Sequence, residues 1–168
     1  MIVIDITKPI IFLDIDGVLA TDSEYETKKT HPLLKCYPFN KKCVKVFNAI
    51  IEEINPLIIL SSDWKYHFTK DEMNEIFLWN GINTIVTDFV PKGTNFTYSK
   101  HYLEECRAAE ILDYVGKHKI TNYVAVDDLH MGRWLNGNFV YCARPNEGIK
   151  QSGVKEKIIN ILKQNIEL

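Results

Sequence analysis

Residues 10–20, IIFLDIDGVLA, carry the clearest indication of the fold of this chain. Its first four residues are apolar without interruption, and Asp14, Asp16 and Gly17 follow them. A short, unbroken apolar run is typical of a strand that is buried on both faces, as in a parallel sheet. Gly17 lets the chain turn sharply after the strand. We therefore expect both carboxylates to point toward the same edge of a buried sheet.

The rest of the chain continues in the same way, because short apolar runs alternate with longer segments of helical period. This alternation predicts a parallel sheet covered by helices on both faces. We predict an α/β fold: a Rossmann-like, doubly wound parallel sheet of about five strands in a three-layer α/β/α arrangement. Gly81 and Gly116 stand where left-handed C-caps are expected. The expected strands are 10–14, 56–60, 84–87, 123–126 and 139–142, and the expected helices are 40–54, 70–80, 101–116 and 153–164.

Composition predicts an ordinary globular protein. The chain has 168 residues, 46% of them hydrophobic and 25% charged, with a formal net charge of -2. We expect one domain over residues 1–168, and the global charge indicates no particular partner. No basic leader or membrane-length apolar run is present, so we expect a cytoplasmic protein without membrane contact. The cysteines lack a C-x-x-C pair, which favours reduced thiols over a zinc site or disulfides: Cys36, Cys43, Cys106 and Cys142.

Polar residues follow further predicted strands at the same sheet edge. LIILSSDW carries a serine pair after its apolar run, and YVAVDDLH carries an aspartate pair. Carboxylates gathered at one edge repel one another unless a cation neutralises them, and an all-oxygen ligand set suits Mg²⁺. Each motif alone is typical of a turn or a helix N-cap, but their convergence favours a metal site. The residues concerned are Asp14, Asp16, Ser61, Ser62, Asp127 and Asp128.

With these motifs, the sequence resembles the haloacid dehalogenase (HAD) superfamily of Mg²⁺-dependent phosphohydrolases. The resemblance implies that Asp14 is the nucleophile, which forms an aspartyl-phosphate, and that Asp16 is the general acid and base. It implies that Ser61 binds the transferring phosphoryl group. It further implies a Mg²⁺ site formed by Asp14, the backbone carbonyl of Asp16, and Asp127 or Asp128.

The superfamily's third motif is a single Lys or Arg, and the sequence offers Lys92, Lys100 and Arg107. Arg107 opens RAAEILDYV, which resembles the helix before the last acidic strand in members that act on nucleic-acid ends. We therefore prefer Arg107 and place Lys100 second as a substrate-binding residue. Ser62 and Lys65, a possible extra phosphate clamp, complete the predicted substrate site. The alternative for each cation is a solvated surface charge.

No insertion is long enough for a separate cap domain, and we expect only a short flap at about residues 20–39. No acidic residue occurs from Thr27 to Ile51, although basic and aromatic residues are frequent there. Such residues can neutralise a phosphate backbone and stack exposed bases, but several would also lie on the solvated face of a helix. The residues are Lys28, Lys29, His31, Lys35, Tyr37, Phe39, Lys41, Lys42 and Lys45.

Together, the capless plan, SSDWK, RAAEI and VAVDD resemble the phosphatase domains of polynucleotide kinase-phosphatases and HAD domains attached to RNA-repair proteins. This looser resemblance suggests removal of a terminal phosphate, such as a 3′-phosphate, from nucleic-acid ends. No kinase P-loop is present, and no obligate protein partner is indicated.

Two other functions stay open. One is a small-molecule phosphatase, such as a nucleotidase or a sugar-phosphate phosphatase, in which the flap closes over a compact substrate. The other is a non-catalytic phosphate-binding or signalling module, such as a receiver domain. Receivers place their acidic pair early and the phosphorylated aspartate alone on a later strand, whereas here the D-x-D motif comes first and the D-D pair last.

Overall fold

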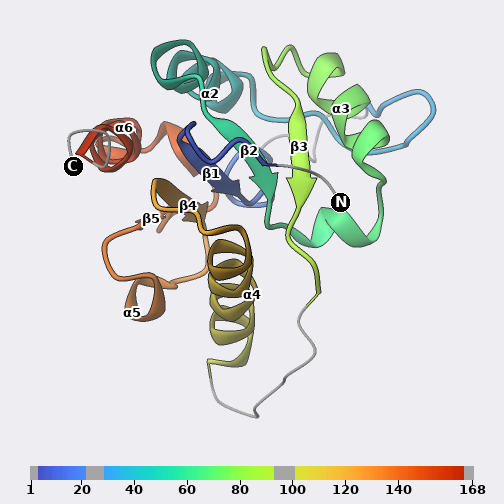
Figure 1. Cartoon of the computed structure of the whole chain (residues 1–168). Coiled ribbons are helices and arrows are strands. Elements are labelled where there is room, and N and C mark those ends of the chain that lie inside the picture. The colour runs from blue at the N-terminus through green and yellow to red at the C-terminus, as the bar shows by residue number, and fades with distance from the viewer. Residues whose placement is uncertain (1–3, 22–28, 93–100, 165–168) are drawn as a thin grey trace.

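The sheet is parallel and has five strands in the order β3-β2-β1-β4-β5 (Figure 1). A computed structural model describes residues 4–21, 29–92 and 101–164 of the chain. This strand order, with the first strand in the middle, confirms the predicted doubly wound α/β class. The strands are β1 (Ile10–Leu13), β2 (Leu57–Leu60), β3 (Val86–Phe89), β4 (Tyr123–Asp127) and β5 (Phe139–Tyr141).

Helices cover both faces of the sheet. On one face, α2 (Lys41–Ile54), α3 (Lys70–Trp79) and α6 (Val154–Gln164) pack against one set of strand residues. On the other, α4 (Tyr102–His118) and α5 (Gly132–Leu135) pack against the alternate set. Ile11 and Leu13 of β1 belong to the first core, and Ile10 and Phe12 to the second. Both faces of β1 are thus buried, as its unbroken apolar sequence predicts.

Three central strands end in register. Leu13, the last residue of β1, pairs with Leu60 of β2 and with Val126 of β4. The backbone N–H of Asp14 donates to Val126 (3.0 Å), and that of Ser61 donates to Leu13 (2.9 Å). The residues that follow these strands therefore lie side by side at one edge of the sheet.

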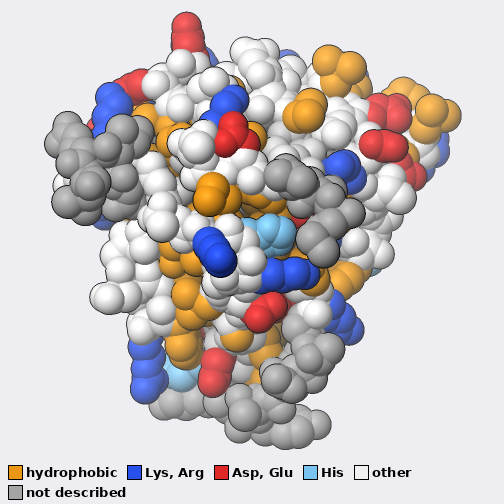
Figure 2. All heavy atoms as spheres, viewed as in Figure 1, with side chains coloured by type: hydrophobic (Ala, Val, Ile, Leu, Met, Phe, Trp, Pro, Cys, Tyr) orange, Lys and Arg blue, Asp and Glu red, His pale blue; other side chains and the backbone are white. Residues whose placement is uncertain are grey.

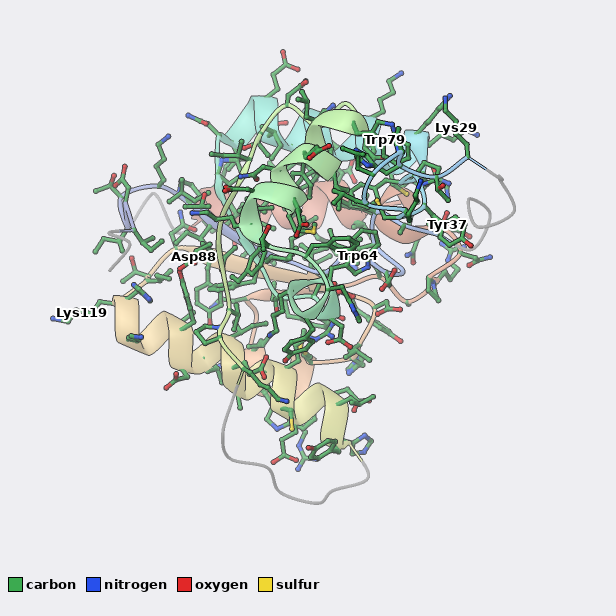
Figure 3. The ribbon with its side chains drawn as sticks, turned by 90° about the vertical axis from the view of Figure 1, so that its right-hand side faces the viewer. Lys29, Tyr37, Trp64, Trp79, Asp88 and Lys119 are labelled. Carbon is green, nitrogen blue, oxygen red and sulfur yellow. The ribbon has the colours of Figure 1, made fainter. Side chains whose placement is uncertain are left out.

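The third predicted helix ends later than expected. We predicted that Gly116 would close it, but α4 continues to His118, and Lys119 takes the left-handed C-cap conformation with φ 54° (Figure 3). The sequence contains a glycine close to the end of the helix, but the N–H groups of Lys119 and Ile120 close the last turn onto Gly116 and Val115. The other predicted glycine cap is confirmed, because Gly81 follows α3 with φ 74°.

Strand β3 begins at Val86, two residues after the predicted start, and the short helices η1 (Asp63–Tyr66), α5 and η2 (Gly148–Lys150) were not predicted. The strands of the described residues form a single sheet. Part of the predicted flap, residues 22–28, lies outside the described residues. None of the described helices is both long and apolar enough to cross a membrane.

Candidate active site

A cluster of carboxylates lies at the ends of β1 and β4. Oxygen atoms of Asp14, Asp127 and Asp128 all lie within 4.8 Å of one another. Asp14 and Asp127 are buried, with exposed fractions of 3% and 1%. Asp128 is partly exposed because it begins the loop after β4. The register of the central strands brings these groups together, although more than a hundred residues separate Asp14 from the aspartate pair.

Burial shifts the protonation of this cluster. It raises the pKa of Asp14 well above its usual range, and the charge of Asp127 raises it further, while Arg107 opposes both. Burial likewise raises the pKa of Asp127 to about 6 and that of Asp128 above its ordinary value. Each shift means that the surrounding protein disfavours the ionised acid. The cluster therefore lacks enough positive charge to hold all its members ionised.

Gly17 is required by this geometry. Its φ is +69°, and a Cβ built there would lie 2.3 Å from Asp128 Oδ2. Any other residue would meet both a strained backbone and the carboxylate of the aspartate pair. The glycine of the D-x-D-G motif thus lets the two acidic loops approach each other closely.

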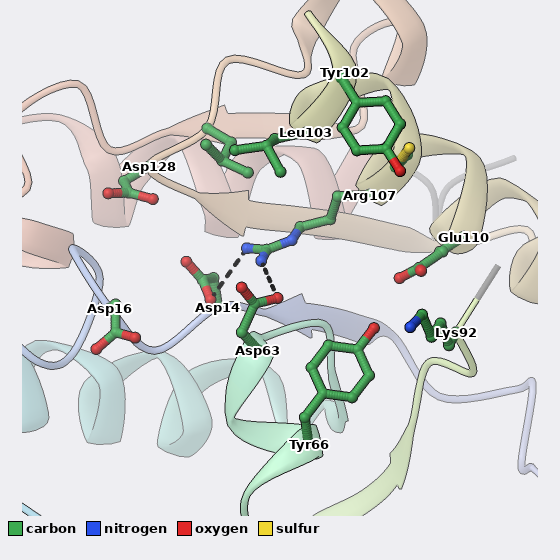
Figure 4. A pocket seen from close by; sticks show the side chains of 12 residues that line it. Asp14, Asp16, Asp63, Tyr66, Lys92, Tyr102, Leu103, Arg107, Glu110 and Asp128 are labelled. Carbon is green, nitrogen blue, oxygen red and sulfur yellow. Dashed lines mark hydrogen bonds and ion pairs between the residues drawn. The ribbon is translucent and has the colours of Figure 1, made fainter. Parts of the chain in front are cut away.

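Arg107 is the cation that reaches the cluster (Figure 4). Its Nη1 lies 3.3 Å from Asp14 Oδ1 and 3.1 Å from Asp127 Oδ2, and its Nη2 lies 2.9 Å from Asp63 Oδ1. The guanidinium therefore contacts groups at the C-terminal ends of β1, β2 and β4. Arg107 is the residue that we preferred as the third-motif cation, and the structure places it against Asp14 and Asp127. Asp63, its most exposed partner, was not predicted.

The two serines after β2 have different environments. The Ser62 side chain caps η1 by accepting from the Trp64 backbone N–H at 3.5 Å, and its hydroxyl hydrogen-bonds Asp14. Ser61 is 2% exposed, and its Oγ is buried with no hydrogen-bond partner among the described residues. Buried hydroxyls in native proteins nearly always have a partner, so an orphaned one calls for a ligand or another explanation.

A cavity of about 360 Å³ opens beside the cluster. Asp14, Asp16 and Asp128 form its acidic side, and Figure 4 shows Tyr66 and Tyr102 on the cavity wall. The aromatic wall was not predicted, because these tyrosines come from different helices and share no sequence pattern with the acidic motifs. The other described lining residues are Asp63, Lys92, Leu103, Cys106, Arg107, Glu110 and Leu129.

Asp16 lies on the rim and is held from a neighbouring strand end. The indole Nε1 of Trp64 donates to Asp16 Oδ2 at 2.9 Å. The sequence alone does not predict this contact, because the two residues follow different strands. Two sequence signals could have pointed to it: both residues lie just beyond predicted strands that end at the same sheet edge, and a tryptophan there has an N–H that needs an acceptor.

The other cations that the sequence offered, Lys65 and Lys100 for substrate binding and Lys92 as a candidate for the third motif, have different outcomes. The Lys65 ammonium is paired with Glu110 at 2.8 Å, and both side chains are largely buried. Lys92 lines the cavity, with its ammonium 5.7 Å from the centroid of the Tyr66 ring. Lys100 lies outside the described residues. The structure thus brings Arg107 and Lys92 to the cavity, whereas the charge of Lys65 is already balanced.

The basic and aromatic flap residues do not gather at the cavity. Phe39 is buried and packs against Trp64 and Phe77, so it belongs to the core. His31 is also buried, with Nε2 3.3 Å from Glu75. Lys28 lies outside the described residues, and the remaining lysines, Lys29, Lys35, Lys41, Lys42 and Lys45, are exposed but do not line the cavity. On the face in Figure 2, described side chains of both charges are interspersed with hydrophobic ones.

The residues of the cluster fit a hard divalent cation. Their ligand atoms are carboxylate oxygens, which Mg²⁺ prefers, and they lie close enough together to share one ion. The raised pKa values of Asp14 and Asp127 point the same way, because an added cation would favour the ionised forms that burial disfavours. Asp14, Asp127 and Asp128 are therefore the side chains that could hold such an ion.

An aspartate just after β1, an acidic pair at the end of β4 and a cation from α4 are the arrangement expected of the HAD class of phosphatase-type hydrolases. Comparison with known families then gives the particular assignment. A family model described as "HAD domain in Swiss Army Knife RNA repair proteins" matches residues 10–154. The chain belongs to this family, as the predicted superfamily and its RNA-repair branch indicated. No match was found among curated proteins or among solved structures.

Proposed function

We propose that this chain is a Mg²⁺-dependent phosphomonoesterase that works through an aspartyl-phosphate on Asp14 and removes a terminal phosphate, such as a 3′-phosphate, from nucleic acid. The observation that carries the proposal is the contact of one guanidinium, Arg107, with both Asp14 and Asp127, together with the orphaned hydroxyl of Ser61, which follows the neighbouring strand. Together they provide a nucleophile, a cation and a hydrogen-bond donor for one phosphoryl group.

In the first step, an Asp14 oxygen attacks phosphorus, and the bond from phosphorus to the ester oxygen breaks. The Asp16 carboxyl, on the rim of the same cavity, donates a proton to the departing oxygen. Asp16 then accepts a proton from a water molecule that attacks phosphorus. Cleavage of the bond between phosphorus and Asp14 releases inorganic phosphate and restores the carboxylate.

Charge stabilisation supplies much of the rate, because an anionic nucleophile must approach an anionic phosphate. Arg107 and the Ser61 hydroxyl would bind the equatorial phosphoryl oxygens. Mg²⁺, held by Asp14, the Asp16 carbonyl and the aspartate pair, would neutralise negative charge on the nucleophile and the phosphate. Nη1 of Arg107, which faces Asp14 and Asp127, would meet the phosphoryl group, and Nη2 would stay on Asp63, at 2.9 Å.

Membership of a family found in RNA-repair proteins supports the nucleic-acid end as substrate. Because no separate cap is present among the described residues, a long polymer could reach the cavity with its terminal phosphate. The cavity volume of about 360 Å³ also fits a single nucleotide or sugar phosphate, which favours the small-molecule phosphatase as a second candidate.

Phosphate release from a matched panel tests the proposal. The panel contains a 3′-phosphorylated oligoribonucleotide, its deoxyribonucleotide counterpart, their 5′-phosphorylated twins, mononucleotides and sugar phosphates, each with Mg²⁺ or with EDTA. We expect Mg²⁺-dependent release that is fastest from an oligonucleotide and absent in Asp14→Asn. Faster release from mononucleotides or sugar phosphates would show that the substrate is a small metabolite and not a nucleic-acid end. Undiminished phosphate release by Asp14→Asn would refute the proposed role of Asp14 as nucleophile.

A further inference from the structure

We propose that Trp64 is a positioning residue that holds the Asp16 carboxylate at the angle required for proton transfer to the leaving group. The inference rests on the proposed phosphatase function. It begins from the 2.9 Å hydrogen bond between Trp64 Nε1 and Asp16 Oδ2, which joins two groups that follow neighbouring strands.

The indole is a rigidly placed donor. Its ring packs against Phe39, with 5.6 Å between centroids and 65° between planes, and against Phe68, with 5.4 Å and 40°. The Trp64 carbonyl accepts from the backbone N–H groups of His67 and Phe68, each at 3.0 Å. Contacts on the ring and on the backbone therefore fix the direction of its N–H group.

Asp16, in contrast, has a fixed backbone but an exposed side chain. Asp16 forms an isolated bridge with Ala20, and the Gly17 N–H donates to the Ala20 carbonyl at 2.8 Å. The outer torsion of an aspartate is broad, so a fixed backbone alone does not set the direction of its oxygens. A hydrogen bond from a rigid donor narrows that distribution, and a proton transfer depends steeply on such alignment.

The chemistry of the donor suits this role. An indole N–H donates but cannot accept a proton, so Trp64 can orient the carboxylate without competing as an acid or base. A carboxylate has about four acceptor positions, so one bond to the indole is compatible with proton transfer at the same group. Packing alone accounts for the contacts with Phe39 and Phe68, but it does not require the N–H to meet an acidic side chain on the cavity rim.

The test compares Trp64→Phe with Trp79→Phe as a matched control. Phenylalanine keeps an aromatic ring near Phe39 and Phe68 and removes the N–H together with part of the ring volume, a loss of volume that the control also contains. Trp79 ends α3 and packs against His31, with 5.0 Å between centroids, so the control removes an indole that does not contact Asp16 (Figure 3). Thermal unfolding of both variants verifies that they are folded.

Kinetics are measured in Mg²⁺ with two phosphomonoesters, an aryl ester whose leaving group needs little protonation and an alkyl ester whose leaving group needs it. The comparison uses kcat/KM, which reports the steps up to departure of the leaving group and excludes the later hydrolysis that both esters share. We expect Trp64→Phe to lower kcat/KM about tenfold on the alkyl ester, because general-acid catalysis contributes 10²- to 10⁴-fold and only its alignment is lost. On the aryl ester we expect kcat/KM to fall by less than about threefold. Trp79→Phe should match the wild type on both esters.

Equal losses on the two esters, or none, would overturn the inference while leaving the proposed function intact. If the wild type hydrolysed neither these esters nor the substrate panel, the proposed function would fail, and with it the catalytic purpose of Trp64. The contact itself has an independent readout in the ¹H–¹⁵N spectrum. The indole resonance that is missing in Trp64→Phe is the resonance of Trp64. Asp16→Ala should shift this resonance and leave those of Trp79 and Trp134 in place. An unshifted Trp64 resonance would refute the hydrogen bond.

Discussion

Replacing Asp127 by Asn is expected to stabilise the metal-free protein at neutral and alkaline pH, although it removes a member of the acidic cluster. Burial raises the pKa of Asp127 from 3.8 to about 6, against the opposing effect of Arg107. The folded state thus binds this proton more tightly than the unfolded chain. Its stabilising effect is complete below about pH 4 and is lost as the pH rises through about 6.

The size of the stability change follows from the pKa shift of Asp127. A rise in pKa from 3.8 to about 6 corresponds to about 3 kcal/mol of unfolding free energy, at about 1.4 kcal/mol for each pKa unit. About 2 kcal/mol of this falls between pH 4.5 and pH 8. Asn resembles the protonated acid, and its amide oxygen can still accept from the Leu129 backbone N–H, which lies 2.8 Å from Asp127 Oδ1. The substitution also removes the repulsion that raises the pKa of Asp14, which acts in the same direction.

Denaturant unfolding in EDTA, across that pH range, measures the effect for the wild type and Asp127→Asn. Taking the difference between the two proteins removes contributions from carboxylates that both share, such as Glu53 and Glu72, whose pKa values are lowered by hydrogen bonds. The variant should gain about 2 kcal/mol on the wild type between pH 4.5 and pH 8, or about 4–8 °C in midpoint temperature.

Adding Mg²⁺ at pH 8 should stabilise the wild type more than the variant, because the variant lacks one oxygen anion of the cluster. A stability difference that is independent of pH would refute the reasoning. The reasoning would also be refuted if, without metal, the unfolding free energy of the wild type rose relative to that of the variant as the pH increased. The ionised Asp127 carboxylate would then stabilise the folded state instead of destabilising it.

Further substitutions test other parts of the site and fold. Gly17→Ala should abolish Mg²⁺-dependent phosphate release and cost about 1–3 kcal/mol in denaturant unfolding, because its Cβ would lie 2.3 Å from Asp128 Oδ2 at a φ of +69°. Arg107→Lys should lower kcat/KM about tenfold or more, because a single ammonium cannot reproduce the fork that meets Asp63 and Asp14. Asn40→Ala should cost about 1 kcal/mol of unfolding free energy without changing kcat of the folded enzyme, because Asn40 caps α2 away from the cavity.

The arrangement of the acidic motifs could be predicted because it depends on local patterns. An unbroken apolar run identifies a strand buried on both faces, and in a parallel sheet all strands end at the same edge. Leu13, Leu60 and Val126 are paired as that argument requires, so Asp14, Ser61 and Asp127 follow them side by side. A resemblance was needed only to give these groups roles.

Contacts between elements far apart in the sequence could not be predicted in this way. The pairing of Lys65 with Glu110 depends on how η1 lies against α4, and no periodicity within either segment encodes that distance. The same holds for the bond between Trp64 and Asp16. At Gly116 a local pattern was present but misleading. The glycine predicted a helix end, whereas α4 continues for two further residues to His118.

Ion pairs fix the position of η1 against α4 at the cavity. Two ion pairs of opposite polarity join η1 to this helix: Asp63 with Arg107 at 2.9 Å, and Lys65 with Glu110 at 2.8 Å. Arg107 and Glu110 stand three residues apart, on one side of the helix.

Alternating charge on both segments favours one register of η1 against α4, because a displacement would bring like charges together. Buried residues of α4 fix the helix on the sheet at the same time, among them Ala108 and Ile111. Arg107 is therefore held between the core and the carboxylates. Its place over Asp14 is set by the packing of the fold as well as by attraction, which is the preorganisation that phosphoryl transfer requires of a cation.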